Sequence, residues 1–213
     1  MSKSEDKPTR AIYEAAARQA EKGGTPNFDT TGGLFDAVRF VIESNAIEGY
    51  EGRSYQAGSP YFEDHLDAYY HAVNEIRERG MTRDLILSGH GILTKELLPP
   101  SGSGKFRDRQ VYVGSYVCPH SNRIERLVEN FVQHCRSGVE SIHDCWDAHF
   151  WFESIHPFID GNGRWGRCLL NAMLLFHGHL PIVIEHQRRF AYYDAIETWR
   201  RANWQRILAD ALG

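Results

Sequence analysis

Twelve consecutive residues govern the fold of this chain: His156-Pro157-Phe158-Ile159-Asp160-Gly161-Asn162-Gly163-Arg164-Trp165-Gly166-Arg167. Proline has no amide hydrogen and disfavours a helical residue before it, so a helix that arrives through Trp151 and Phe152 should end near His156. The Asp-Gly-Asn-Gly segment then predicts a tight turn. Apolar residues recur at helical spacing from Trp165 to Leu174, which predicts a second helix that ends near Gly178. A glycine-rich turn therefore leads directly into the N-terminus of a helix.

This arrangement suits the binding of a polyphosphate. The first amides of a helix are unpaired and carry partial positive charge, and flanking glycines let a ligand approach the backbone. Arg164 and Arg167 are three residues apart, so both can reach phosphate oxygens from one helix face. Asp160 offers a hard oxygen ligand for Mg²⁺, and His156 can accept a proton near neutral pH. Each signal also occurs at ordinary turns and helix ends, and only their joint occurrence at fixed spacing supports this interpretation.

The segment HPFIDGNGRWGR resembles the Fic-family signature HPFx[DE]GNGRxxR at every defined position. The resemblance implies a mainly α-helical bundle with a small β-hairpin flap. It implies an enzyme that transfers AMP from ATP to a Ser, Thr or Tyr hydroxyl of a target protein and releases pyrophosphate. In that assignment His156 is the catalytic base, Asp160 holds Mg²⁺ and Phe158 anchors the loop by packing. The nucleotide-binding residues are Gly161, Asn162, Gly163, Arg164 and Arg167.

A second motif, Ser44-Asn45-Ala46-Ile47-Glu48-Gly49, ends a helix that is predicted to begin at Thr31. It resembles the [ST]xxxE[GN] inhibitory motif of Fic proteins, and its place before the core implies a self-inhibited member. On this interpretation Glu48 pairs with Arg167 in the space of the γ-phosphate, while Ser44 faces the same side one turn earlier. Gly49 completes the motif. Taken alone, a helix that ends in Glu-Gly is ordinary, because glycine is a natural cap.

Two further sets of site residues come from the resemblance. Gln110 to Gly114 has the clearest strand alternation in the chain, where Fic proteins carry their flap, so Val111, Tyr112 and Val113 would pair with the target backbone. A plain surface ribbon is the alternative. Lys105 and Arg107 would meet acidic target residues or solubilise the loop. Tyr192 and Tyr193 fall where the family often places aromatic groups near adenine, and simple packing is the alternative.

Apolar periodicity and capping residues predict the remaining helices. These span residues 60–80, 85–98, 121–136, 141–155, 189–199 and 202–212, with Ser59 and Thr82 as N-caps. His149 is interpreted as a core histidine with a satisfied hydrogen bond. Glu153 either orients His156 or lies at the solvated surface, and His90, between two glycines, has no assigned role.

Composition limits the class of protein. The chain has 213 residues and a formal net charge of −4, which argues against a nucleic-acid-binding surface. No apolar run approaches the roughly 18–20 residues that span a bilayer, and the polar start lacks a signal-peptide core, so a soluble, cytoplasmic protein without membrane contacts is expected. Four cysteines without CxxC spacing predict reduced thiols. We expect a mobile segment over residues 1–30, an inhibitory helix and linker over 31–57, and a Fic catalytic domain over 58–213.

Other functions remain open at this level. The site could use another nucleotide donor, could remove AMP with Glu48 orienting a water, or could bind nucleotide without turnover. Transfer of phosphate is disfavoured, because the kinase-like proteins that resemble the family carry Lys where this chain has Gly163. Beyond the protein substrate, self-modification and a homo-oligomer are further expected partners.

Overall fold

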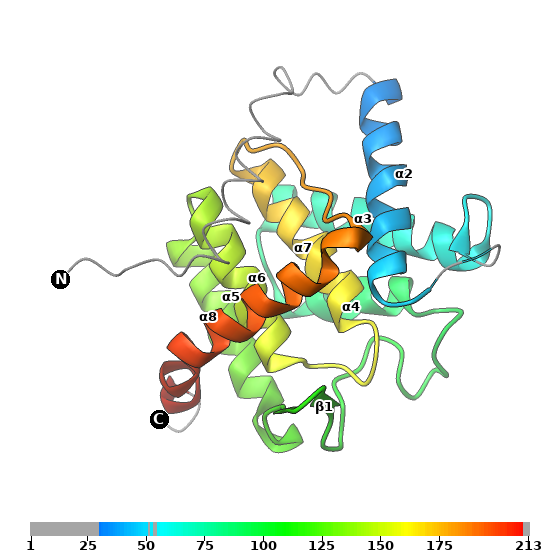
Figure 1. Ribbon diagram of the computed structural model, residues 1–213. Helices are drawn as coiled ribbons and strands as arrows, with labels where there is room; N and C mark the ends of the chain where they lie inside the picture. Colours follow the sequence, from blue (N-terminus) through cyan, green and yellow to red (C-terminus); the bar gives the residue numbers. More distant parts are fainter. Residues whose placement is uncertain (1–29, 51, 53–54, 211–213) are drawn as a thin grey trace.

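The structure is a computed structural model that describes residues 30–50, 52 and 55–210. The expected mobile segment over residues 1–30 lies almost entirely outside these ranges. Within them the chain is mainly α-helical, with one short antiparallel hairpin (Figure 1). The elements in chain order are α2 (Thr30–Ile47), α3 (Pro60–Arg79), α4 (Arg83–Leu93), β1 (Tyr112–Val113), β2 (Tyr116–Val117), η2 (Ser121–Arg123), α5 (Ile124–Gly138), α6 (Ile142–Ile155), α7 (Asn162–Phe176), η3 (His186–Arg188) and α8 (Arg189–Asp210). The predicted fold class, a helical bundle with a small hairpin, is confirmed.

Side-chain caps fix where several helices begin. The Phe62 amide donates to the Ser59 hydroxyl at the start of α3, and Pro60 occupies the first turn, where its missing amide hydrogen costs nothing. The Leu85 amide donates to Thr82 Oγ1 at the start of α4. Both predicted caps are therefore confirmed.

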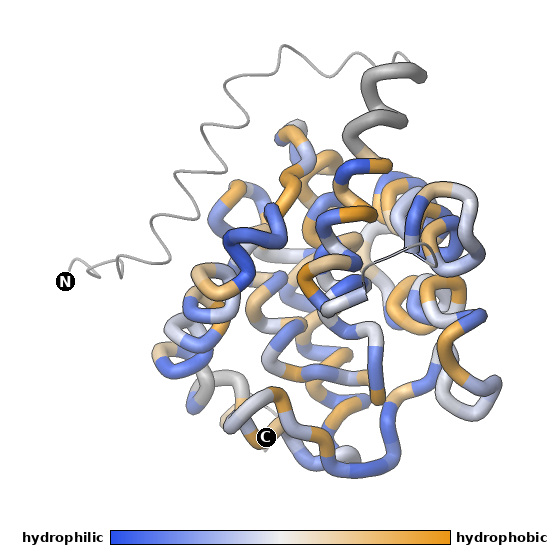
Figure 2. Tube along the Cα trace, turned by 45° about the vertical axis from the view of Figure 1, so that its right-hand side comes forward, coloured by the Kyte–Doolittle hydropathy of each residue, from blue (hydrophilic) through white to orange (hydrophobic). Residues whose placement is uncertain are grey.

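Helix α7 lies at the centre of the bundle and packs against α3, α4, α6 and α2 (Figure 1). Its partner α6 is buried over most of its length, as its aromatic content predicts. Hydrophobic and hydrophilic residues alternate along the helices (Figure 2), and the buried hydrophobic residues form one core cluster. The largest apolar side chains of α6 and α7 that are less than 2 % exposed are Trp146, Phe150, Phe152 and Trp165. This packing holds the predicted turn between α6 and α7 on rigid supports at both ends.

Three predicted boundaries differ from the structure. Helix α4 ends at Leu93 rather than Leu98, because the Thr94 side chain donates to the His90 carbonyl and the chain continues in turns. The two expected closing helices are one helix, α8, in which Glu197 pairs with Arg200 and Arg201 across the expected break. The hairpin is shorter than predicted.

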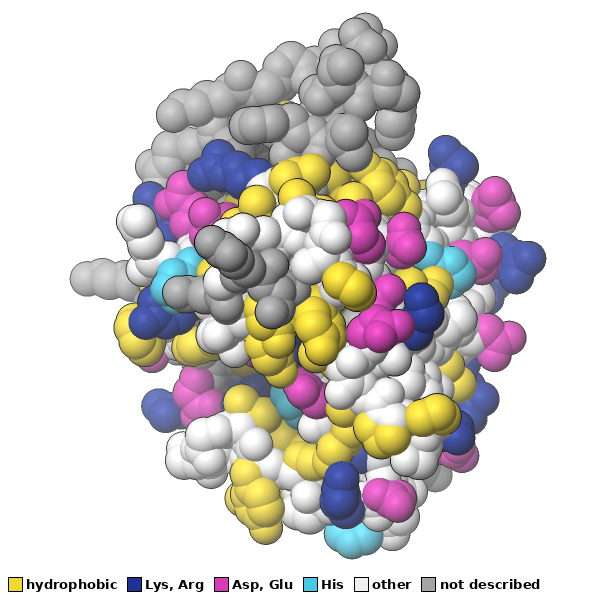
Figure 3. All heavy atoms as spheres, turned by 90° about the vertical axis from the view of Figure 1, so that its right-hand side faces the viewer, with side chains coloured by type: hydrophobic (Ala, Val, Ile, Leu, Met, Phe, Trp, Pro, Cys, Tyr) yellow, Lys and Arg dark blue, Asp and Glu magenta, His cyan; other side chains and the backbone are white. Residues whose placement is uncertain are grey.

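The surface of the described residues carries both signs of charge. On the face seen in Figure 3, basic and acidic side chains are interspersed, and hydrophobic side chains reach the surface near the middle. No described helix combines the length and hydropathy needed to cross a bilayer. The four cysteines are free thiols, as predicted.

Two glycines of α4 provide a matched test of its packing on α7. A Cβ on Gly89 would lie 2.0 Å from Cη2 of Trp165, whereas the nearest atom to a Cβ on Gly91 is Gly104 Cα at 3.5 Å. We expect Gly89→Ala to lower the free energy of unfolding by about 1–3 kcal/mol through overpacking. Gly91→Ala should be neutral or stabilising by up to about 1 kcal/mol, because alanine is the better helix former. Thermal or urea unfolding of the two variants measures the difference, and equal stability of the pair would contradict this packing.

Candidate active site

His156 ends α6 in a left-handed backbone conformation, with φ 50° and ψ 61°. It is the only residue other than glycine with a positive φ in the described part of the chain. Pro157 prevents the helix from continuing, as predicted, and the His156 amide still donates to the Phe152 carbonyl. The chain therefore turns sharply at the imidazole and enters the motif loop.

The imidazole of His156 is held neutral. Burial lowers its pKa to about 4, and the Glu153 backbone carbonyl and the Glu48 carboxylate oppose this shift. Nδ1 is the enclosed ring nitrogen, while the residue as a whole is partly exposed. Nε2 is thus the nitrogen that can meet a substrate, and at neutral pH it is free to accept a proton.

The motif loop delivers the N-terminus of α7, as predicted. Gly161, with φ 78°, is its N-cap residue, and no side chain caps the first turn. The Asn162 side chain is turned back on the loop, where its Oδ1 accepts from the Phe158 amide and its Nδ2 donates to the Phe158 carbonyl. Asn162 thus shapes the loop, and the unpaired amides at the start of α7 remain for an anion.

His90 anchors this loop, a role that the sequence did not reveal. Its Nδ1 accepts from the Gly104 amide, so its Nε2 carries the hydrogen that is donated to the Asp160 carbonyl at 2.9 Å. The ring stacks on Phe158 with centroids 3.6 Å apart, and burial lowers the pKa of His90 to about 4. Phe158 is fully buried, as predicted. The only sequence signal is a histidine between two glycines, which permit close packing at that point of α4.

Arg164 and Arg167 are both buried, each 2 % exposed, although their guanidinium groups are charged. Nε and Nη2 of Arg164 and Nη1 of Arg167 have no hydrogen-bond partner within the described residues. Buried donors of this kind are costly unless a ligand satisfies them. The two side chains therefore provide the donors that a polyphosphate needs.

The predicted inhibitory motif contacts Arg167. Glu48 Oε1 accepts from Arg167 Nη2 at 2.8 Å, and the same guanidinium donates to the Ser44 hydroxyl and carbonyl at 2.8 and 2.9 Å. Glu48 Oε1 also occupies the space above Gly163, 2.2 Å from the position of a Cβ there. Gly49 follows with φ 78°. The predicted contact between Glu48 and Arg167 is therefore present in the structure.

Helix α2, which carries this motif, is fastened to residues near the start of α8. The Arg39 guanidinium pairs with Glu185 at 2.9 Å, and Glu43 Oε2 accepts from the His186 amide at 2.7 Å. The Tyr193 hydroxyl donates to the Ile47 carbonyl at 2.9 Å, so Tyr193 holds the end of α2. Glu48 is thus presented to Arg167 by a helix that is held at residues 39, 43 and 47.

Tyr50 covers the opposite side of the loop. Its hydroxyl donates to Asp160 Oδ2 at 3.2 Å, and the Arg164 guanidinium lies over its ring, 4.4 Å from the centroid. Nothing in the motif pattern singles out this residue, which stands directly after Gly49. Tyr50 therefore engages both the predicted metal ligand and one of the predicted phosphate-binding arginines.

Asp160 is the predicted metal ligand. Its side chain is 48 % exposed and lies 3.7 Å from Arg164 Nη2. No cluster of three or more His, Cys, Asp or Glu side chains suited to a metal occurs in the described ranges. A half-exposed single carboxylate fits Mg²⁺ that takes its other ligands from phosphates and water, which is the usual way this ion is held beside a nucleotide.

Tyr192 is buried at 2 % exposure beneath Arg167, whose guanidinium lies 5.7 Å from the ring centroid. Its hydroxyl bonds to His149 Nε2, while His149 Nδ1 bonds to the Gly166 carbonyl. His149 is thus the hydrogen-bonded core histidine that the sequence predicted. Tyr192 supports Arg167 from within the core.

Glu153 is buried at 6 % exposure, so its interpretation as a solvated surface residue is wrong. Its Oε1 fills the space above Gly166, 2.3 Å from the position of a Cβ, and has no hydrogen-bond partner within the described residues. Burial raises the pKa of Glu153 to about 7, against the lowering effect of Arg167. Glycines 163 and 166 of α7 thus each make room for a carboxylate beside Arg167.

The flap residues only partly match the prediction. Tyr112 and Val113 form β1 and pair with Val117 and Tyr116, whereas Val111 lies just before the strand. Tyr112 and Val113 are exposed, which leaves this ribbon accessible to another chain. Arg107, expected to contact a target or solvent, is instead 5 % exposed, because backbone carbonyls surround its guanidinium.

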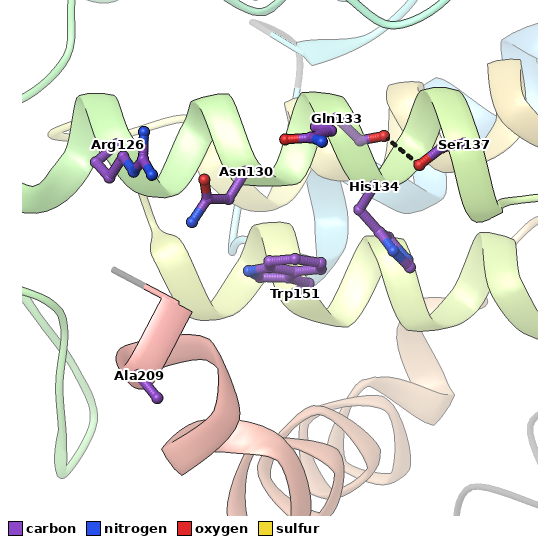
Figure 4. Close-up of a pocket in the computed structure, with 7 residues that line it drawn as sticks. All are labelled: Arg126, Asn130, Gln133, His134, Ser137, Trp151 and Ala209. Carbon is purple, nitrogen blue, oxygen red and sulfur yellow. Dashed lines mark hydrogen bonds between the residues drawn. The ribbon is translucent and has the colours of Figure 1, made fainter. Parts of the chain in front are cut away.

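An open groove of about 520 Å³ lies elsewhere, between α5, α6 and the end of α8 (Figure 4). The side chains that line it are Arg126, Asn130, Gln133, His134, Ser137, Trp151 and Ala209. None of them belongs to the predicted site. The groove is therefore separate from the chemistry around His156.

Comparison with known proteins agrees with this geometry. Residues 80–174 match the model of the Fic/DOC family. The protein adenylyltransferase Fic of Drosophila persimilis is 38 % identical over 102 residues, which cover 46 % of this chain and 20 % of the relative. The relative from Drosophila willistoni is 39 % identical with the same coverage. The chain spans about a fifth of the length of these curated relatives.

Two solved structures share the fold. A Fic domain containing signaling protein from Bacteroides thetaiotaomicron has a TM-score of 0.69 at 18 % identity, covering 89 % of this chain and 80 % of its own. A Fic-1 fragment from C. elegans has a TM-score of 0.67 at 18 % identity, covering 96 % and 67 %. The HPFIDGNGRWGR loop at the head of α7, the match of residues 80–174 to the Fic/DOC family model and the shared fold together support the identification of this chain as a member of the Fic family.

Proposed function

We propose that this protein is an adenylyltransferase that moves AMP from ATP to a hydroxyl side chain of a protein. The observation that carries the proposal is the pair of buried arginines with unpaired donors, set beside an uncapped helix N-terminus and a neutral imidazole. The donors suit a triphosphate, and the imidazole suits removal of a proton from an alcohol. The relatives named protein adenylyltransferase support the same reaction.

In this reaction the target hydroxyl oxygen attacks the α-phosphorus of ATP and forms the new phosphate ester bond. The bond from the α-phosphorus to the bridging oxygen breaks, and pyrophosphate leaves. His156 Nε2 receives the hydroxyl proton. The Arg164 and Arg167 guanidinium groups and the α7 amides hold the phosphates, so catalysis rests on alignment and on neutralisation of charge.

Asp160 is the residue that would hold Mg²⁺. The ion would supply positive charge that stabilises the phosphates and the pyrophosphate leaving group. Tyr50 bonds to Asp160 Oδ2, so its hydroxyl would share the carboxylate with the metal and hold its orientation. Tyr112 and Val113 on the flap would align an extended target segment by strand pairing.

Glu48 is proposed to inhibit this reaction from within the same chain. Its carboxylate neutralises Arg167 and fills the space above Gly163, which the terminal phosphate would otherwise use. A triphosphate that enters beside Glu48 is displaced, and in-line attack on the α-phosphorus then fails. Relief of inhibition requires Glu48 to leave Arg167.

The test uses the Glu48→Gly protein with ATP and Mg²⁺, followed by intact-mass measurement of this protein and of proteins in a lysate. AMP added to a hydroxyl residue, located by fragmentation, is the expected result. Parallel reactions with UTP and CDP-choline identify another donor by the mass of the attached group. ATP binding by calorimetry without any covalent product would overturn the proposal in favour of a binding module.

The pH dependence of kcat/KM, which reports ionisation of the free enzyme, should reflect the low pKa of His156. An imidazole with a pKa of about 4 remains unprotonated at pH 5.5, and activity is lost only as pH falls through about 4. An ordinary histidine would lose activity through about pH 6.5. The Glu48 carboxylate raises the pKa of His156. Its removal should therefore lower this pKa and shift the loss of activity to a more acidic pH. The profile is measured for Glu48→Gly as kcat/KM. A second profile at saturating ATP shows whether Glu153, whose pKa burial raises to about 7, contributes through nucleotide affinity.

A further inference from the structure

Arg107 connects the flap to the turn that carries His156. Its Nε donates to the His156 carbonyl at 2.8 Å, and its backbone amide donates to the Pro157 carbonyl at 3.0 Å. Its Nη1 donates to the Arg109 carbonyl at 2.9 Å and its Nη2 to the Pro119 carbonyl at 2.6 Å. Residues 109 and 119 lie on the two sides of the hairpin, just before β1 and just after β2. One guanidinium therefore binds both sides of the hairpin and the backbone of His156.

The chemistry of this contact is unusual for a buried arginine. Each of the three acceptors of the side chain is a backbone carbonyl, so the guanidinium serves as a rigid planar connector rather than as half of an ion pair. The left-handed conformation of His156 is unfavourable for a residue other than glycine. Binding of its carbonyl by Arg107 offsets part of that cost and fixes the orientation of the turn.

Tyr116 makes a second connection between the same two parts. From β2 of the flap, its hydroxyl donates to the Ser154 carbonyl at 2.8 Å, two residues before His156. The Arg200 guanidinium of α8 lies over the Tyr116 ring at 3.6 Å and also reaches Ser154 Oγ. The flap is thus fastened to the end of α6 at Ser154 and at His156.

We propose that Arg107 is a positioning residue that keeps the flap and His156 at a fixed separation, with Tyr116 as the second fastening. The proposal rests on the proposed function, in which the flap holds the target segment and His156 takes its proton. Because neither residue contacts the predicted nucleotide site, loosening them alters the approach of the hydroxyl and leaves ATP binding intact. A misplacement of about 1 Å between reacting groups costs roughly a hundredfold in rate.

The experiment compares Arg107→Lys, Tyr116→Phe and the double variant with their Glu48→Gly parent. Lysine keeps the charge but cannot reach three carbonyls at once. We expect Arg107→Lys to lower AMP transfer at saturating ATP by roughly ten- to a hundredfold, with the ATP dissociation constant within about twofold of the parent. Tyr116→Phe should have a smaller effect in the same direction, and the two should be non-additive because they fix one geometry.

Arg109→Lys is the matched control, since Arg109 is an exposed arginine on the same loop and only its carbonyl takes part. It should leave transfer and ATP binding unchanged. Transfer by Arg107→Lys at the parental rate, or a parallel loss of ATP affinity, would overturn the proposal. If Arg107→Lys does not fold, AMP transfer by Tyr116→Phe at the parental rate would overturn the proposal.

Amide hydrogen exchange separates this proposal from the proposed function. In Arg107→Lys, exchange should accelerate both in residues 109–119 and in residues 153–158, while Arg109→Lys leaves both segments as they were. Acceleration of the flap alone would show that the turn does not depend on Arg107. Hydrogen exchange does not depend on catalysis. Absence of AMP transfer in the parent would therefore refute the proposed reaction, while the exchange result would still test the role of Arg107.

Discussion

His156→Ala, made in the Glu48→Gly protein, is expected to lower the rate of AMP transfer by roughly a hundredfold to ten-thousandfold, the usual contribution of a general base. The imidazole is the neutral acceptor at the mouth of the site, and alanine has no group that can take the hydroxyl proton. The rate is measured with radiolabelled ATP or by intact mass at saturating nucleotide.

ATP binding provides the control for this variant. The phosphates are proposed to bind Arg164, Arg167 and the amides of α7, none of which is removed, so the dissociation constant should stay close to that of the parent. The backbone of residue 156 must still adopt φ near 50°, and alanine is no better suited to this than histidine. An undiminished rate would remove His156 from the reaction.

Glu48→Gly is expected to have the second largest effect, a rise in ATP affinity and in transfer together. The carboxylate occupies Arg167 at 2.8 Å and the space above Gly163, so its removal frees both the charge and the volume that a phosphate needs. Couplings between competing groups of this kind are typically about 5–150-fold, and the affinity should rise by an amount in that range. Calorimetry with ATP and Mg²⁺ measures it.

Two comparison variants separate charge from volume. Glu48→Gln keeps the shape and loses the charge, so its affinity should lie between those of the starting protein and Glu48→Gly. Glu43→Gln removes the charge of an α2 acid that accepts from the His186 amide, but glutamine keeps an oxygen that can accept the same hydrogen bond. Helix α2 should therefore stay anchored and ATP affinity should be nearly unchanged. If Glu48→Gly binds ATP no better than the starting protein, Glu48 does not compete with nucleotide.

The sequence was sufficient wherever the determining contacts are local. Pro157 ends α6, Gly161 begins α7 and Ser59 and Thr82 cap their helices through neighbours within four residues. The same is true of the positions of His156 and of the two arginines relative to one another. Contacts between residues that are close in the sequence can be predicted from the order of the residues alone.

Residues whose role depends on a distant partner were missed or misjudged. His90 acts through the Asp160 carbonyl, and Arg107 through those of Pro119 and His156. Every residue has the same backbone carbonyl, so no pattern of side chains in the sequence indicates which carbonyls will accept these hydrogen bonds. The surface alternative for Glu153 is wrong for a related reason, because the burial of this side chain depends on the space left by Gly166 on another helix. Only the packed structure reveals these contacts.

The anchoring of α2 has a thermodynamic consequence. The Glu48 carboxylate is part of the same chain and is held by Arg39, Glu43 and Ile47, so its effective concentration at Arg167 is set by geometry and does not fall on dilution. A nucleotide therefore competes with an intramolecular carboxylate, and the effective concentration of this carboxylate does not depend on how much protein a cell makes. Under the proposed inhibition, activity responds to whatever detaches α2 from residues 185–193, and expression level alone leaves the balance between the two states unchanged.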